Sequence, residues 1–435
     1  MFNSNTKKVF LIIYICALFL QTLIFLLNEH HQININHDIW YEKSAYNWVE
    51  KGSCRIFWSD SVAADLVTNN PIQQGVYYNW RPVGYSVFLA AIMELDFLDF
   101  NAMKSFFQII LYSLIPSFIF LIATELFAKY SIKNHLSVLA AIIAIGNPIF
   151  LISPLQSIDT WLTTLFTVIS FYFLIKSYHF QDRRYFLAFS LIGLFFCRPN
   201  GVFPFFLILV VLIYKSPKNY RYLFLFPIIL IMFSVCSWGI RNYIYFQKFD
   251  FANSSIGYNL WLGNNQYSKD FFVKYIGDGT TIEDNIVPKY NPLWSFLKNY
   301  SEYKKDAFFK QQAWDFIKSH PMETLENASW KIVGFWSPLR VRTDHWSDSP
   351  TKTVLLLIYN TPLIILSFFS VLIHFWRKEN KIKKEKGLLI LFIFLWMLPH
   401  LAFFSTSRFR APIDFGLVIL SVDFVGNFLI RIKSK

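Results

Sequence analysis

Asp38 is the residue in this sequence whose position best suits proton-transfer chemistry. It follows the first apolar segment, residues 9–27, closely and opens a polar loop between two apolar segments. A carboxylate at this point can take the proton of a hydroxyl or amine that attacks a substrate at the membrane surface. The same aspartate would also suit the N-cap of the short helix predicted over residues 41–50, so both interpretations stay open.

Arginines predicted at the same surface supply positive charge for an anionic leaving group. Guanidinium groups favour phosphate because they offer paired N–H donors in one plane. The phosphate-binding candidates are Arg81, Arg198, Arg241, Arg408 and Arg410. One phosphate needs fewer, so some of these side chains are expected to be ordinary interfacial arginines.

A second carboxylate and several polar side chains complete the candidate site. Asp159, at the outer end of a predicted span, is the second catalytic candidate, with a helix cap as its alternative role. His37, Tyr41, Tyr85 and Lys331 are the candidates for the donor or acceptor pocket. No pair of histidines has the spacing of metal ligands. No cofactor is therefore predicted, although a divalent metal stays open.

The elements that must position these residues are membrane helices. The chain has 435 residues, of which 54% are hydrophobic and only 16% charged, with a mean hydropathy of +0.37. Crossing the hydrocarbon core takes about 20 apolar residues. Ten segments of this kind begin near Val9, Met103, Leu136, Asp159, Tyr185, Val202, Tyr222, Thr353, Leu388 and Pro412. We expect an all-α polytopic membrane protein with about ten transmembrane helices and exoplasmic juxtamembrane helices.

The distribution of lysine and arginine sets the expected orientation. The basic residues gather in the two termini and in the short loops on their side of the membrane, which indicates a cytoplasmic face. The net charge of +13 is then mainly a topology signal, and no nucleic-acid partner is implied. The opposite face receives two large loops, residues 29–80 and 241–352. The prediction is one domain, residues 1–435, with the second loop as a helical exoplasmic cap.

The cytoplasmic loops contain no glycine-rich phosphate cradle from which a nucleotide site would be built. Group transfer on the outer face then needs a donor that arrives within the bilayer. A sugar on a polyprenyl phosphate meets this condition. Its transfer by direct displacement requires a base and a phosphate-binding site, whereas a general acid is dispensable because a phosphate leaves readily.

Seven short motifs, together with the helices predicted from Glu302 to Trp336, appear in an order and a membrane placement that resemble one family. They are Asp38 followed by Tyr41, Tyr46 and Gly52; Arg81-Pro82-Val83-Gly84-Tyr85; Asp159; Arg198-Pro199-Asn200-Gly201; Trp238-Gly239-Ile240-Arg241-Asn242-Tyr243; Gly257-Tyr258-Asn259-Leu260-Trp261-Leu262-Gly263-Asn264; and Ser407-Arg408-Phe409-Arg410-Ala411-Pro412-Ile413. The chain resembles the GT-C membrane glycosyltransferases, particularly the polyprenyl- or dolichyl-phosphate-sugar-dependent enzymes that include protein O-mannosyltransferases and lipid A aminoarabinose transferases (family 39-like).

This resemblance implies a catalytic aspartate in the first outer loop, carried onto Asp38, and a second acidic residue, carried onto Asp159. It also implies an inverting hexosyl or pentosyl transferase of the bacterial inner membrane, with a periplasmic active site and both termini in the cytoplasm. The partners would be an undecaprenyl-type sugar donor, membrane lipids and an unidentified acceptor. Arg81 and Val83 depart from the family's Pro-Pro-Gly-Tyr segment, which leaves the donor and the acceptor open.

Two other functions remain compatible with the sequence. An O-antigen polymerase or ligase would use a diphosphate-linked donor and would place its essential residues in the loop at 241–352. A transporter of lipid-linked sugars would use the interrupted segment at Pro199 to line a substrate path and would leave the sugar-phosphate bond intact. Turnover distinguishes a transferase from a transporter.

Overall fold

The structure is a computed structural model of the full chain. It describes residues 4–31, 39–52, 56–57, 76–77, 81–95, 99–155, 158–179, 183–217, 221–251, 253–266, 268, 300–339, 350–376, 384–405 and 407–433. His37 and Asp38 lie outside these residues, as does most of the first outer loop.

Long apolar helices dominate the described residues. Seven of them are long and apolar enough to cross a membrane, or eight if the bent pair α6 and α7 forms one span. These are α1 (Ser4–His31), α4 (Phe100–Tyr112) continued by α5 (Leu114–Leu126), α8 (Thr160–His179), α11 (Arg221–Phe246), α17 (Pro350–Trp376), α18 (Lys384–Ala402) and α19 (Asp414–Lys433) with the preceding η4 (Ser407–Ile413), while α6 is Lys133–Ile145 and α7 is Pro148–Ile152. The chain is a helical membrane protein.

The expected number of ten spans is not confirmed. Two of the predicted spans are α9 (Arg183–Cys197) and α10 (Val202–Lys215), which have 15 and 14 residues. At a rise of 1.5 Å per residue each covers about 20 Å, less than the roughly 30 Å of a hydrocarbon core. The break between them is the short 3-10 helix η2 (Pro199–Gly201).

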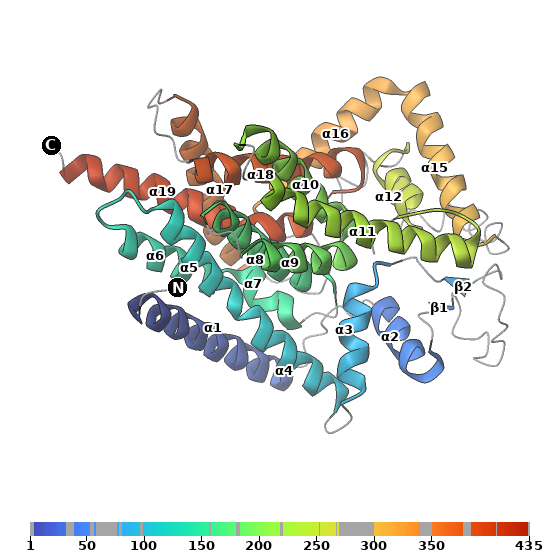
Figure 1. The fold of residues 1–435 in the computed structure, drawn as a ribbon, viewed down its shortest axis with the longest axis horizontal. Coiled ribbons are helices and arrows are strands. Elements are labelled where there is room, and N and C mark those ends of the chain that lie inside the picture. Colours follow the sequence, from blue (N-terminus) through green and yellow to red (C-terminus); the bar gives the residue numbers. More distant parts are fainter. Residues whose placement is uncertain are drawn as a thin grey trace.

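Shorter elements gather towards one end of the bundle. They are α2 (Ile39–Lys51), α3 (Gly84–Met93), α12 (Ile256–Gly263), α15 (Glu302–Ser319), α16 (Pro321–Trp336), and the two-residue strands β1 (Ile56–Phe57) and β2 (Val76–Tyr77), while η1 (Ser153–Leu155) precedes α8. The strands pair antiparallel, with Ile56 opposite Tyr77, a small addition to the expected all-helical loop. Figure 1 shows both chain termini towards the opposite end of the bundle.

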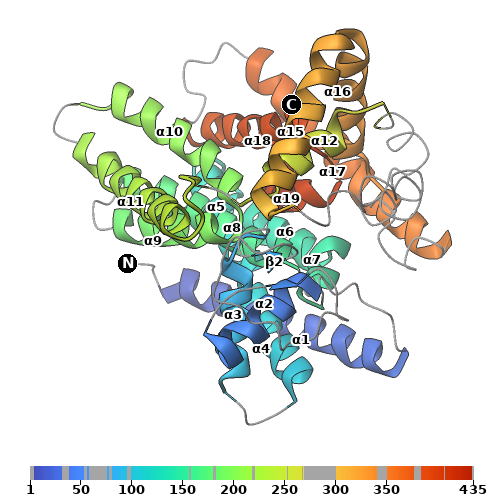
Figure 2. The same ribbon diagram turned by 90° about the vertical axis from the view of Figure 1, so that its right-hand side faces the viewer.

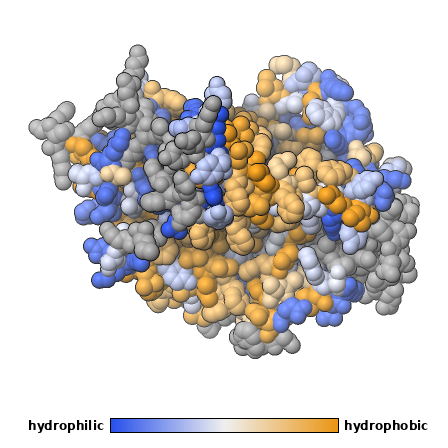
Figure 3. All heavy atoms as spheres, viewed as in Figure 1, coloured by the Kyte–Doolittle hydropathy of each residue, from blue (hydrophilic) through white to orange (hydrophobic). Residues whose placement is uncertain are grey.

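Apolar residues cover the middle of one face of the molecule (Figure 3). Figure 3 shows hydrophobic residues across the centre of the visible face and hydrophilic residues mainly towards its two ends. Seen from the end that carries α2 and α3, α8 lies between two groups of helices, one with α2, α3 and α4 and the other with α12, α15 and α16 (Figure 2). The start of α8 contacts α3, since the rings of Trp161 and Tyr85 lie 6.0 Å apart, and α8 also contacts η4.

Gly84 allows α3 to approach the end of α9 closely. A Cβ atom at this position would lie 2.7 Å from the carbonyl carbon of Phe196 and 2.8 Å from the amide nitrogen of Cys197. Any larger side chain would push the two backbones apart. The Arg81 to Tyr85 segment is thereby packed directly against the residues that precede Arg198.

Candidate functional site

Asp159 and Arg198 form a buried ion pair at the start of α8. Asp159 lies directly before the helix, and Arg198 follows α9 in extended backbone just before Pro199. Arg198 donates from Nε and Nη2 to Asp159 Oδ2, at 3.3 and 2.9 Å. Only 7% of Arg198 is exposed. The sequence placed both residues in the site, and the structure pairs them.

An aromatic stack supports the other side of the Arg198 guanidinium. Its Cζ lies 5.0 Å from the ring centroid of Phe409, which itself stacks on His400 at 5.0 Å and 10°. Trp396 Nε1 donates to the Phe409 carbonyl at 3.0 Å. These contacts hold the Ser407 to Ile413 segment against the ion pair and bring the half-buried Arg408 to the same region.

Tyr41 and Tyr85 belong to an aromatic contact chain that reaches α8. Their ring centroids are 5.2 Å apart, and Tyr85 lies 6.0 Å from Trp161. The Tyr85 hydroxyl donates to Gln108 Oε1 at 2.7 Å, while Ser86 Oγ donates to the Tyr41 carbonyl at 3.2 Å. Helix α2 is therefore fixed to α3 only a few residues after its start at residue 39.

Three buried polar atoms lie near the start of α8, and two of them belong to residues, Thr160 and Trp161, that the sequence did not identify as site groups. Thr160 Oγ1, Trp161 Nε1 and Arg198 Nη1 are buried and have no hydrogen-bond partner among the described residues. Buried polar groups are normally paired, and the N-terminus of a helix attracts negative charge. The only sequence signal for Thr160 and Trp161 was their place directly after Asp159. This arrangement can receive an anionic group.

Two other candidate arginines lie close to this region but carry partners. Arg241 Nη1 donates to Asn242 Oδ1 at 2.8 Å, and its Cζ lies 4.8 Å from the Trp238 ring. Trp238 in turn contacts Phe196 at 5.8 Å. Arg81 is half-buried and immediately precedes the Pro82 to Tyr85 segment. Both remain candidates for contact with a substrate at this end of the bundle.

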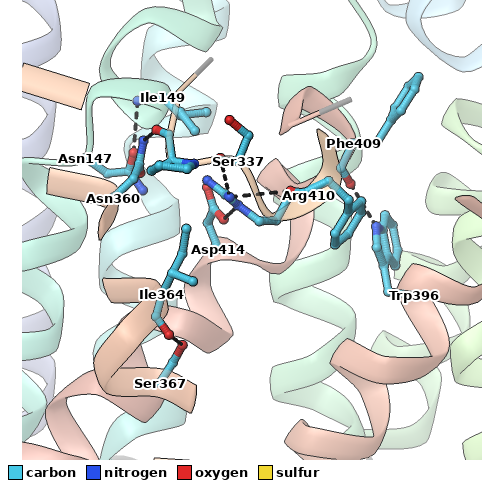
Figure 4. A network of polar contacts seen from close by, with 12 residues as sticks. Asn147, Ile149, Ser337, Asn360, Ile364, Ser367, Trp396, Phe409, Arg410 and Asp414 are labelled. Carbon is cyan, nitrogen blue, oxygen red and sulfur yellow. Dashed lines mark hydrogen bonds and ion pairs between the residues drawn. The ribbon is translucent and has the colours of Figure 1, made fainter. Parts of the chain in front are cut away.

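Arg410 belongs to a different, internal network. It is 1% exposed, donates from Nε to Asp414 Oδ1 at 2.9 Å, and donates from Nη1 to the carbonyls of Ser337 and Phe335 at 2.8 and 3.4 Å. Figure 4 shows the guanidinium pointing to Asp414 and Ser337. These contacts join η4 to the end of α16. The geometry gives Arg410 a structural position.

Lys331 is also completely buried. Its Nζ donates to Asn264 Oδ1 at 3.1 Å and to the carbonyls of Leu401 and Ala402 at 3.0 and 3.3 Å. Asn264 Nδ2 donates to the same Ala402 carbonyl at 2.7 Å. Burial lowers the pKa of the Lys331 ammonium to about 7. The lysine, predicted as a pocket residue, binds carbonyls at the end of α18 that the helix itself cannot satisfy.

Asp306 is a second buried charged residue that binds the backbone of another segment, the start of α12. Its Oδ1 accepts hydrogen bonds from the amides of Gly257 and Tyr258, at 2.6 and 3.1 Å, and so caps the start of α12 from a distant helix. Burial raises the pKa of the Asp306 carboxyl to about 6. Phe309 packs with Trp261 and with Phe404, which leads into η4. Helices α12 and α15 are thus connected to the segment that carries Arg408.

Within the described part of the chain, no group of three or more His, Cys, Asp or Glu side chains has the geometry of a metal site. No protein-family model matches the sequence, and a comparison with curated proteins finds no match. The chain forms a helical membrane protein with a buried aspartate-arginine pair at the start of α8.

Proposed function

We propose that this protein is a membrane glycosyltransferase that transfers a sugar from a polyprenyl-phosphate donor to an acceptor. One observation carries the proposal: segments far apart in the sequence meet at one end of the bundle. The contacts run from Tyr41 through Tyr85 and Trp161 to the Asp159–Arg198 pair and on to Phe409. The unpaired donors buried there, on Thr160, Trp161 and Arg198, support a bound anion.

Arg198 is the phosphate-binding residue that the geometry favours. Asp159 occupies Nε and Nη2, which fixes the guanidinium plane and leaves Nη1 available. Trp161 Nε1 and Thr160 Oγ1 supply further donors beside the positive end of α8. Arg81 and Arg408 would approach a phosphate from the sides, whereas the guanidinium of Arg410 is already occupied by protein acceptors.

Asp38 serves as the general base in this proposal. It removes the proton of the acceptor hydroxyl or amine while that atom attacks the anomeric carbon of the sugar. The bond from the anomeric carbon to the phosphate oxygen breaks, and its electron pair stays on the phosphate. The polyprenyl phosphate leaves as an anion, stabilised by Arg198, and the sugar is transferred with inversion. This displacement requires no general acid.

The site would face the periplasm of a bacterial inner membrane, with both termini in the cytoplasm. The lysine- and arginine-rich termini and their common end of the bundle in Figure 1 support this orientation. The acceptor is a lipid, a glycan or a protein presented at that surface. Tyr41 and Tyr85, which are 3% and 0% exposed, would support the wall of the site from within the protein.

The test is release of free polyprenyl phosphate by the purified protein in lipid discs, from a panel of polyprenyl-phosphate sugars with a membrane lipid extract as acceptor. We expect the wild type to release it and Asp38→Asn to bind the donor without turnover, because an amide cannot accept the proton. Asp99→Asn is the matched control, since Asp99 caps α4 outside the site and is exposed. Turnover by Asp38→Asn at the wild-type rate would refute the base assignment. Transport of an intact donor without release would establish a transporter.

A further inference from the structure

Helix α16 buries two polar side chains and exposes several apolar ones, beside the exposed polar residues Glu323, Glu326 and Ser329. Its buried residues include the polar side chains Asn327 and Lys331. Its exposed residues include Met322 at 77%, Leu325 at 63%, and Val333. An apolar face normally turns towards the protein core and a polar face towards solvent. The opposite arrangement is expected where the surroundings of the helix are apolar.

The exposed apolar residues form a single stripe along α16. Met322, Leu325, Ile332 and Val333 follow the spacing of three, seven and one residues, which places all four on one side at about 100° per residue. Each of the four residues is at least 40% exposed. The exposed Ser329 lies on the same side, between Leu325 and Ile332, and the exposed Glu326 borders it. The four apolar side chains are still close enough together to form a contact surface.

Contacts with α18 place α16 at the level where that membrane helix ends. Lys331, in the second half of α16, binds the carbonyls of Leu401 and Ala402, the last residues of α18. Trp336, at the end of α16, donates from Nε1 to Met397 Sδ at 3.2 Å. Met397 is five residues before the end of α18, about 7 Å deeper along the helix. Helix α16 therefore lies beside the C-terminal end of α18.

We propose that α16 lies in the lipid-water interface and that lipid covers the stripe formed by Met322, Leu325, Ile332 and Val333. The membrane-spanning helices also expose apolar side chains, and hydrophobic residues cover the middle of the visible face (Figure 3). Interfacial helices of this kind bury an apolar face at the acyl boundary and keep a polar face in the headgroups.

The residues at the helix boundaries agree with a lipid occupant. Lys318 and His320, at the turn between α15 and α16, are exposed and can contact anionic headgroups. Trp330 and Trp336 are partly buried on α16 itself, and tryptophan favours this interface. The exposed acidic residue Glu323 lies about 100° from Met322, on the polar side of the stripe.

Photo-crosslinking tests this placement without requiring turnover, so its outcome is separate from that of the proposed transferase activity. The photoreactive residue p-benzoylphenylalanine replaces Leu325 or Val333 in the full chain, and Glu323 in the matched control. The protein is irradiated in discs of phosphatidylethanolamine and phosphatidylglycerol and analysed by intact mass. We expect phospholipid adducts from positions 325 and 333, at least fivefold more abundant than from position 323.

Three outcomes would overturn the proposal. Covalent dimers from position 325 or 333 would show that a second copy covers the stripe. Absence of lipid adducts at both positions, with the protein still monodisperse, would show that the stripe faces water. Equal adduct formation at position 323 would show that no particular face of α16 contacts lipid.

Discussion

Replacing Asp159 by asparagine tests whether the buried pair holds Arg198 in place. Arg198 makes two hydrogen bonds to one carboxylate oxygen, at 2.9 and 3.3 Å. A hydrogen bond to a charged group contributes about 1.5–3 kcal/mol, and removing one partner of a buried pair costs about 3–5 kcal/mol. The amide oxygen of asparagine can keep one of the two bonds. We therefore expect Asp159→Asn to lower the free energy of unfolding by about 3 kcal/mol.

Asp414→Asn provides the matched comparison. Arg410 would keep the carbonyls of Ser337 and Phe335 as acceptors, so the expected loss is only about 1–2 kcal/mol. The free energies are measured by reversible unfolding in mixed micelles of a mild detergent and dodecyl sulfate. A loss below about 1 kcal/mol for Asp159→Asn, or a loss no larger than that of Asp414→Asn, would refute the reasoning.

The double variant Asp159→Asn/Arg198→Gln separates the pair from its surroundings. Because this variant removes both charges, it should be more stable than the sum of the two single losses predicts, with a coupling energy of about 1–3 kcal/mol. A coupling energy near zero would mean that the two side chains act independently. Donor affinity should fall for Arg198→Gln in both backgrounds if this guanidinium binds the phosphate.

Three further predictions follow from close packing at Gly84 and from the burial of Asp306 and Lys331. Gly84→Ala should lower the free energy of unfolding by about 1–3 kcal/mol, since its Cβ would lie 2.7 Å from the Phe196 backbone. Gly387→Ala is the control and should be neutral or stabilising, because its Cβ would meet nothing nearer than 3.9 Å. Equal melting temperatures for the two variants would contradict this prediction. Between about pH 4 and 6 the native Asp306 carboxyl keeps a proton that the unfolded chain has released, so stability falls as pH rises, by up to about 3 kcal/mol. Asp306→Asn should flatten that slope in melting curves from pH 4 to 7. For Lys331, stability changes with pH in the opposite direction. From about pH 7 to 10 the unfolded chain keeps a proton on this amine that the native protein has released, so stability rises with pH. An unchanged rise in Lys331→Met would show that another group causes it.

The sequence predicted the helical membrane architecture because apolar segments of sufficient length have few other stable structures in a bilayer. It could not fix the number of spans. The segments that became α9 and α10 are apolar throughout, but the break at Pro199 shortens both helices to 15 and 14 residues. Whether such a half-length helix crosses the membrane depends on its neighbours, which hydropathy does not describe.

The candidate site was predicted less completely, because arginines that look alike in the sequence differ in their acceptors. Arg408 and Arg410 are two residues apart in one motif, yet the guanidinium of Arg410 is bound by Asp414 and by carbonyls from α16. Arg198 is bound by one carboxylate, that of Asp159 just before α8, and keeps a buried nitrogen unpaired. These acceptors come from segments some 40 to 75 residues away, apart from Asp414. No local pattern reveals them.

The assignment of Arg198 thus depends on what its partners leave unused. A phosphate that bound Nη1 would satisfy a buried donor for which the described residues offer no acceptor, and a buried unsatisfied donor costs about 1–3 kcal/mol. The pair with Asp159 would meanwhile keep the guanidinium rigid and partly neutralised, so that a leaving phosphate is stabilised without being held too tightly to release. Charge on its own would favour any of the candidate arginines; an orientation fixed by one carboxylate, together with one free donor, favours Arg198.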